Sequence, residues 1–174
     1  LALFPAPARA LSPKEIYKKT APSVVAILCY DLKGSGTAGT GFVIDEKARI
    51  LTNAHVVISG KGAPYEKIWV YFKPETLTGN PDKDLRNPLK ATVVRFDEKL
   101  DLALLSLEGP PGGSPLALAD PASVEIGDYV AAICHPEQGG LPWCNRQRLP
   151  SAGLALREAV AAVHGPGTAG LERH

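Results

Sequence analysis

Two apolar segments, Gly39-Thr40-Gly41-Phe42-Val43-Ile44-Asp45 and Ile50-Leu51-Thr52-Asn53-Ala54-His55-Val56-Val57, are separated by only four residues. Their β-branched and aromatic residues predict two strands joined by a short loop. The second strand runs out in small and polar residues around His55, so the imidazole lies at a strand end, where a side chain can face a cleft. A lone histidine is more often a surface or core residue than a catalytic one, so its surroundings must decide its role.

Four further strands are predicted around this pair. They are the β-branched and apolar segments Ser23–Tyr30, Lys67–Phe72, Ala91–Phe96 and Leu102–Leu107, which join the strands Thr40–Asp45 and Arg49–Thr52. Six strands in roughly a hundred residues are typical of a closed barrel or a sandwich. Before them, Ser12 as N-cap with Pro13 and Glu15 predicts a short helix through Lys19, and the aperiodic residues 73–89 predict a surface loop.

A glycine-rich segment, residues 34–39, matches the dinucleotide fingerprint G-x-G-x-x-G letter for letter. That fingerprint requires a helix after the glycines, whose N-terminus faces the pyrophosphate. Here the glycines run directly into the strand Thr40–Asp45. We therefore interpret residues 34–39 as the loop of a β-hairpin.

The composition changes in the last third of the chain. Gly109–Ser114 reads as a linker, and Asp128–Cys134 predicts the opening strand of a second unit, entered through a turn at Gly127. All eleven lysines lie at or before Lys99, and residues 141–174 contain no Lys, Asp, Ile, Phe or Tyr. Strand signals stop near Leu141, so we expect an irregular or helical tail, with one weak helical stripe at its centre.

These patterns divide the chain into four parts. Residues 1–10, ending in Ala8-Arg9-Ala10, have the small-x-small pattern of a signal-peptide remnant, which predicts an exported, periplasmic or secreted protein. The alternative is an ordinary disordered N-terminus. Residues 11–108 contain the helix and the six predicted strands, residues 109–140 the linker and the start of a second unit, and residues 141–174 the atypical tail. No run of about 18 apolar residues predicts a membrane span.

Composition gives little support to other classes of function. The formal net charge of +1 carries no basic footprint for nucleic acid. Cys29 lies inside an apolar strand, where a thiol behaves as a small hydrophobic group, and three cysteines predict no disulfide framework. Cys134, His135 and Cys144 lie close in sequence, but adjacent strand residues point to opposite faces, so we predict neither a metal site nor a cofactor and place His135 in a loop.

Asp101 is the acid that could act with His55. It lies in Glu98-Lys99-Leu100-Asp101-Leu102-Ala103-Leu104-Leu105, between two leucines at the entry to a strand. One interpretation is a strand-edge aspartate held by solvent. The other is a buried carboxylate that accepts from the imidazole N–H, fixes its tautomer and stabilises the imidazolium.

The three motifs Gly39–Asp45, Ile50–Val57 and Asp101–Leu105 resemble those around the catalytic His and Asp of chymotrypsin-like serine proteases, in the form seen in the HtrA branch. Ile16–Val25 is similar to the lead-in to the family's first strand, and residues 115–130 resemble the entry to its second barrel. The resemblance covers Ser12 to about Gly140. It implies an all-β fold of two perpendicular six-stranded barrels, the first complete and the second partial in this chain, with the active site between them.

The resemblance also implies a Ser-His-Asp triad that hydrolyses protein or peptide substrates, with His55 as general base and Asp101 as its orienting carboxylate. The nucleophile should be a Ser in a Gly-x-Ser-Gly-Gly-like loop that also forms the oxyanion hole. No such sequence is present. Ser106, Ser114 and Ser123 precede the second barrel, and Ser151 has other neighbours, so the nucleophile stays unknown and we expect the chain as given to be inactive.

Three hypotheses follow for the whole protein. The first is a serine endopeptidase whose present chain is truncated or changes reading frame near Leu141, and a divergent genuine tail is the alternative to that frame change. The second is a non-catalytic pseudoprotease that holds peptides by β-addition. The third is a defective product that exposes unpaired barrel edges.

Overall fold

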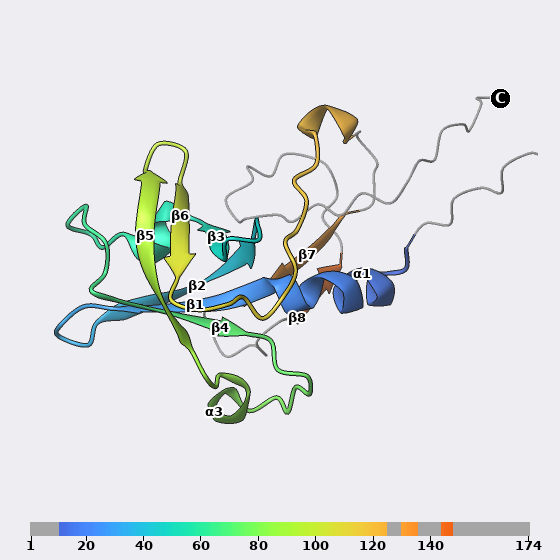
Figure 1. The fold of residues 1–174 in the computed structure, drawn as a ribbon, viewed down its shortest axis with the longest axis horizontal. Coiled ribbons are helices and arrows are strands. Elements are labelled where there is room, and N and C mark those ends of the chain that lie inside the picture. The colour runs from blue at the N-terminus through green and yellow to red at the C-terminus, as the bar shows by residue number, and fades with distance from the viewer. Residues whose placement is uncertain (1–10, 125–129, 136–143, 148–174) are drawn as a thin grey trace, which may run out of the picture.

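Six strands of the chain form a closed antiparallel barrel in the order β1-β2-β3-β6-β5-β4 (Figure 1). The computed structural model describes residues 11–124, 130–135 and 144–147. The signal-peptide remnant predicted at residues 1–10 and the helical stripe predicted in the tail lie outside them. The strands of the barrel are β1 (Val24–Tyr30), β2 (Gly36–Val43), β3 (Arg49–Thr52), β4 (Lys67–Phe72), β5 (Leu89–Asp97) and β6 (Leu102–Leu107).

The barrel confirms the six strands predicted from the sequence, although β2 ends two residues before its predicted limit and β5 is three residues longer than predicted. The largest difference lies at the glycine-rich segment. Only residues 31–35 form the β1–β2 turn, in which Asp31 Oδ1 accepts from the N–H groups of Lys33 and Ser35. Gly36 already pairs with Tyr30, so β2 begins inside the segment interpreted as a loop. These glycines are followed by a strand and not by the helix that a dinucleotide site needs.

Glycine is required in β2 because neighbouring atoms occupy the space of a side chain. A Cβ atom at Gly39 would lie 2.4 Å from Cγ2 of Val56, and one at Gly41 would lie 2.7 Å from Cγ2 of Ile50. Real Cβ atoms do not approach so closely. The short helix α2 (Ala54–Val57), which follows β3, therefore packs directly on the backbone of β2.

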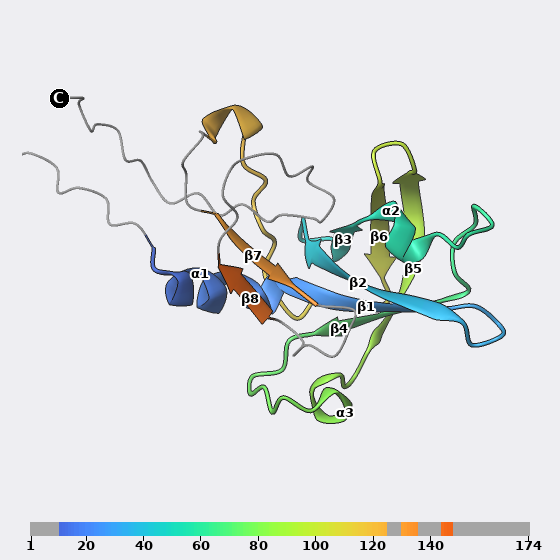
Figure 2. The same cartoon turned by 180° about the vertical axis from the view of Figure 1, so that it is seen from behind.

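The core fills the barrel with aliphatic side chains from every strand. Ile27, Val43, Ile50, Val70 and Leu105 are fully buried. Strand β1 departs from simple alternation, because Val24 and Ala26 on its other face are also buried. Strand β7 (Ala131–Cys134) and the 3-10 turn Ala21–Ser23 contact β1, and Figure 2 shows the β7–β8 hairpin beside it.

Cys29 is one of the core residues, as predicted. Its side chain is fully buried in β1. Burial raises the pKa of the Cys29 thiol to about 12, so it stays protonated at neutral pH.

Helix α1 (Pro13–Thr20) confirms the predicted capping box. The Ser12 Oγ accepts from the Glu15 N–H at 3.3 Å, and the Glu15 carboxylate accepts from the Ser12 N–H at 2.7 Å.

The loop predicted at residues 73–89 contains a one-turn helix, α3 (Pro81–Asp84), and the first residue of β5. Asp84 is buried and accepts hydrogen bonds from Thr78 N–H, Thr78 Oγ1 and Gly79 N–H. These local polar contacts order the segment without an apolar face. For that reason it has no hydrophobic period from which a helix could be predicted.

The predicted linker is packed against the barrel. A Cβ atom at Gly112 would lie 2.7 Å from Cγ of Phe72, and the Ser23 Oγ donates to the carbonyl of Ser114. Further on, the Leu116 N–H donates to the Val43 carbonyl at 2.9 Å. The route toward the second unit is therefore fixed on the barrel surface.

The described part of the second unit is an antiparallel pair, β7 with β8 (Cys144–Gln147). Strand β7 begins three residues later than the predicted strand, whose residues 128 and 129 lie outside the described ones. The expectation that strands stop near Leu141 is wrong, because β8 lies beyond it. Its four residues carry no apolar alternation, so pairing with β7 rather than local pattern defines the strand. Within the described residues, no helix is long and apolar enough to cross a membrane.

We expect Gly39→Ala to destabilise the barrel by about 1–3 kcal/mol, because the new methyl group overlaps Val56. Val56→Ala removes both overlapping Cγ atoms and leaves only Cβ, 3.1 Å from the new methyl. The cost of Gly39→Ala should therefore be smaller in a Val56→Ala background. Urea denaturation of the four variants of this double-mutant cycle measures the coupling. Equal costs in both backgrounds would contradict the packing of α2 on β2.

Candidate active site

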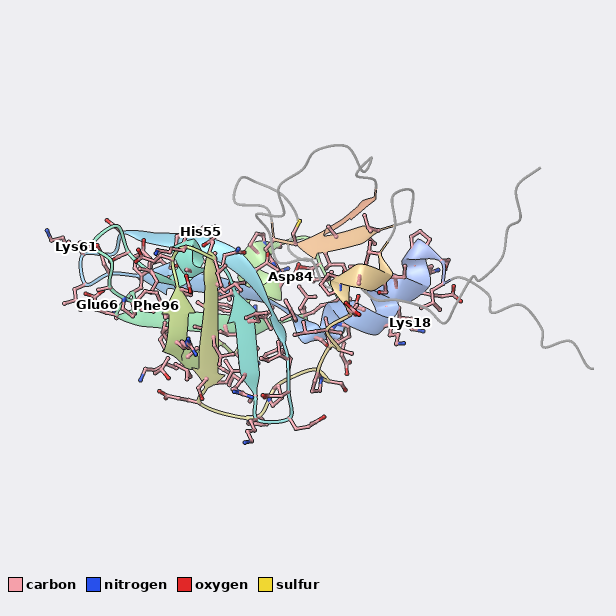
Figure 3. All side chains as sticks on the ribbon, turned by 90° about the horizontal axis from the view of Figure 1, so that it is seen from above. Lys18, His55, Lys61, Glu66, Asp84 and Phe96 are labelled. Carbon is pink, nitrogen blue, oxygen red and sulfur yellow. The ribbon has the colours of Figure 1, made fainter. Side chains whose placement is uncertain are left out.

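The pairing of β3 with β6 brings together the two residues singled out in the sequence. Thr52 lies opposite Ala103, and the antiparallel register continues past both strands toward His55 on one side and Asp101 on the other. The sequence predicted His55 at the end of the strand. The structure places it instead on the one-turn helix α2, which begins two residues after β3. Figure 3 shows it on the barrel, well away from Lys18 of α1.

Asp101 holds His55 at two points. Its Oδ2 lies 2.7 Å from Nδ1 of the imidazole, and its Oδ1 accepts from the His55 backbone N–H at 3.0 Å. The His55 side chain is 58% exposed and the Asp101 side chain 34% exposed. The carboxylate thus fixes the inner edge of a ring whose other nitrogen remains accessible to a reacting group.

The Asp101 backbone adopts an unusual conformation to make these contacts. Its φ of 52° lies in the left-handed region, which costs a non-glycine residue roughly 1–2 kcal/mol. The Asn53 side chain stands against it, with Nδ2 at 3.1 Å from the Asp101 carbonyl oxygen and 3.2 Å from its Oδ2. No role for Asn53 was predicted from the sequence. Its position two residues before the histidine was the available signal.

Opposing effects act on the pKa of Asp101. Partial burial raises the pKa of this carboxyl. The hydrogen bonds from the His55 backbone and ring, together with that from the Asn53 amide, lower the pKa by more than burial raises it. The net result is a pKa below the ordinary value, so Asp101 is ionised at neutral pH. An ionised carboxylate at 2.7 Å requires Nδ1 to carry the proton and leaves Nε2 as the basic nitrogen.

A hollow of about 290 Å³ opens beside the imidazole. Its walls come from α2, the segment that follows it and the β5–β6 turn: Ala54, His55, Ile58, Ser59, Gly60, Gly62, Glu98 and Asp101. The Ser59 Oγ donates to the Ala63 carbonyl at 2.9 Å. Among the described residues, no serine hydroxyl is hydrogen-bonded to His55, and the hollow beside the ring is large enough to receive a substrate group.

His135 connects the second unit to the strand that underlies the site. Its backbone N–H donates to Thr40 Oγ1 at 2.9 Å, and its Nδ1 lies 3.3 Å from the same oxygen. It directly follows β7, outside the strand, as predicted. Cys134 and Cys144 are backbone partners in the β7–β8 register. Burial lowers the pKa of the His135 imidazole to about 4, so the ring is neutral at neutral pH.

The chain is similar to known proteases. Residues 39–165, which include both His55 and Asp101, match the family described as the trypsin-like peptidase domain. The serine protease HTRA3 of Homo sapiens is 30% identical over 128 residues, which are 70% of this chain and 26% of that protein. The serine protease HTRA1B of Danio rerio is 31% identical over 127 residues, 70% of this chain and 23% of that protein. The chain thus spans about a quarter of the length of these curated relatives.

Solved structures show the same likeness. The Rv3671c protease from M. tuberculosis in its active form has a TM-score of 0.54 at 29% identity, covering 80% of this chain and 55% of that one. The serine endoprotease from Yersinia pestis has a TM-score of 0.52 at 26% identity, covering 72% of this chain and 39% of that one. Both agree with a chymotrypsin-like fold whose first barrel is closed and whose second is partial.

We expect the stability of the fold to fall between about pH 6.5 and pH 4 because of His135. The unfolded chain binds a proton on this ring near pH 6.5, whereas the folded chain does so only near pH 4. The loss over that range should be of order 3 kcal/mol. Urea denaturation at several pH values measures it, with His135→Gln as the comparison. If both proteins lose the same stability, the imidazole is not buried in the neutral form.

Proposed function

The chain belongs to the trypsin-like peptidase family, and on that premise we propose that His55 and Asp101 are the general base and the orienting carboxylate of a serine endopeptidase. The observation that carries this proposal is the double contact of Asp101 with the ring and the backbone of His55, at 2.7 and 3.0 Å. The substrates are proteins or peptides, and the reaction is hydrolysis of the peptide bond.

The geometry supports different roles for His55 and Asp101 in the reaction. A serine hydroxyl supplied to Nε2 of His55 gives up its proton to that nitrogen as the oxygen attacks the scissile carbonyl. Asp101 stabilises the positive charge that then develops on the imidazole, and the proton later passes to the leaving amine. The hollow beside α2 can hold a substrate side chain next to the imidazole while this happens.

We further propose that the 174 residues as given do not hydrolyse peptide bonds by themselves. They contain no Gly-x-Ser-Gly-Gly sequence, and Ser151, the last serine of the chain, lies in Leu-Pro-Ser-Ala-Gly. Loss of a triad member leaves roughly 10³ to 10⁴-fold catalysis over water, and only where the oxyanion hole is intact. The same loop forms the oxyanion hole in this family. A chain without that sequence therefore lacks both the serine nucleophile and the oxyanion hole.

The tail after Gly140 admits two explanations. The absence of Lys, Asp, Ile, Phe and Tyr from residues 141–174 supports a change of reading frame or a truncation near Leu141. The family match through residue 165 and the pairing of β8 with β7 support a divergent tail. The two differ in the coding DNA, where a frame change leaves the missing motif in another frame.

The purified chain should neither cleave casein nor react with a fluorophosphonate probe, because no serine of the described residues is hydrogen-bonded to His55. An active preparation of a related serine protease is the positive control. Labelling that disappears in Ser151→Ala would contradict the proposal and identify Ser151 as the nucleophile. Binding of casein without cleavage would instead favour the pseudoprotease, which holds a peptide in the hollow or on a strand edge.

If the other frames after the Gly140 codon encode a Gly-x-Ser-Gly-Gly sequence, we expect the protein read through that frame to cleave casein. In that protein, Asp101→Asn should lower kcat about 10⁴-fold and His55→Ala about 10⁶-fold. Glu46→Gln, an exposed change in the β2–β3 turn, serves as the matched control and should leave the rate unchanged. Activity that survives His55→Ala would show that this histidine is not the base.

A further inference from the structure

We propose that Asn53 is a positioning residue, which locks the carboxylate of Asp101 against the backbone of the same residue and so aims it at His55. Its meaning for catalysis rests on the proposed function, whereas the lock itself is a property of the first barrel. The contacts that carry the proposal join three chain segments: the end of β3, the first turn of α2 and the start of β6.

One amide group makes both contacts to Asp101. Asn53 Nδ2 lies 3.1 Å from the Asp101 carbonyl oxygen and 3.2 Å from its Oδ2. A side-chain amide has two N–H donors, so it can serve both oxygens at once. The carbonyl and the carboxylate are thereby tied together, and the residue is held at its left-handed φ of 52°.

The way α2 is capped supports a dedicated role for this amide. Asn53 is the N-cap residue of α2, and an asparagine in that place ordinarily accepts from the N–H of the second or third helical residue. Here it makes no capping bond. The N–H of His55, the second helical residue, donates to Asp101 Oδ1 instead. The Asp101 carboxylate, distant in sequence, thus caps the helix in place of Asn53, and the Asn53 amide in turn binds that carboxylate.

These contacts couple the orientation of the His55 imidazole to Asn53. Asp101 Oδ2 is the oxygen that faces Nδ1 of His55 at 2.7 Å, and it is also one of the two oxygens that Asn53 contacts. Without the amide, the carboxylate can rotate about its χ angles and the left-handed backbone loses a support. The ring then keeps a partner but loses its fixed direction.

A matched control is present in the same chain. Asn80 is the N-cap residue of α3, a helix of the same length, and its Oδ1 accepts from the Asp82 N–H at 3.0 Å in the ordinary way. Asn80→Ala therefore removes a helix cap without touching the His55–Asp101 pair. Any effect of Asn53→Ala that Asn80→Ala does not share comes from the contacts to Asp101.

The test is NMR spectroscopy of the purified 174-residue chain, which needs no nucleophile. In Asn53→Ala, we expect the low-field proton signal of His55 Nδ1–H to broaden or disappear, and the pKa of the Asp101 carboxyl to rise because one hydrogen bond that lowers it is gone. Asn53→Asp, which keeps the size and the capping ability, should raise the apparent pKa further because two carboxylates then face each other. Asn80→Ala should change neither signal.

An unchanged proton signal together with an unchanged Asp101 titration in both Asn53 variants would overturn the proposal and leave Asn53 as a structural residue. If Asn53→Ala does not fold, Asn53→Asp alone decides. These outcomes are independent of proteolysis. Failure of the frame-restored protein to cleave casein would sink the proposed function and leave the positioning role of Asn53 intact.

Discussion

The pairing of β3 with β6 is the contact on which both the barrel and the site depend. These strands are separated by about fifty residues of sequence. Their pairing joins the three strands β1, β2 and β3 to the three strands β4, β5 and β6. The same register places the residues after β3 beside those before β6. Closure of the barrel and the meeting of His55 with Asp101 are therefore one structural event, and no change that opens this ladder can spare the site.

Electrostatics and backbone geometry reinforce each other at that junction. The Asp101 carboxylate accepts from a helix N–H, an imidazole N–H and a side-chain amide, and these donors outweigh the effect of burial on its pKa. Each donor comes from a residue within three positions of the end of β3. A single charged group thus organises the whole turn, including the one-turn helix that is too short to be stable alone.

The elements best predicted from the sequence are those with a strong local pattern. Strand β4 alternates in sequence and β6 is an almost continuous apolar run, and the predicted limits of both agree with the structure. His55 and Asp101 were identified through motifs, and the structure brings them within hydrogen-bonding distance. The role of Asn53 could not be predicted, because it depends on a partner 48 residues away and on a left-handed backbone at that partner. Strand β8 was missed because its order comes from β7 rather than from its own residues.

The six barrel strands occupy an uninterrupted stretch of the chain, from Val24 to Leu107, and β6 is the last of them. On a ribosome, the nascent chain has everything it needs to close the barrel before the second unit is made. By then both His55 and Asp101 have been synthesised, because both lie within this stretch. The pairing of His55 with Asp101 can therefore form while the rest of the chain is still emerging.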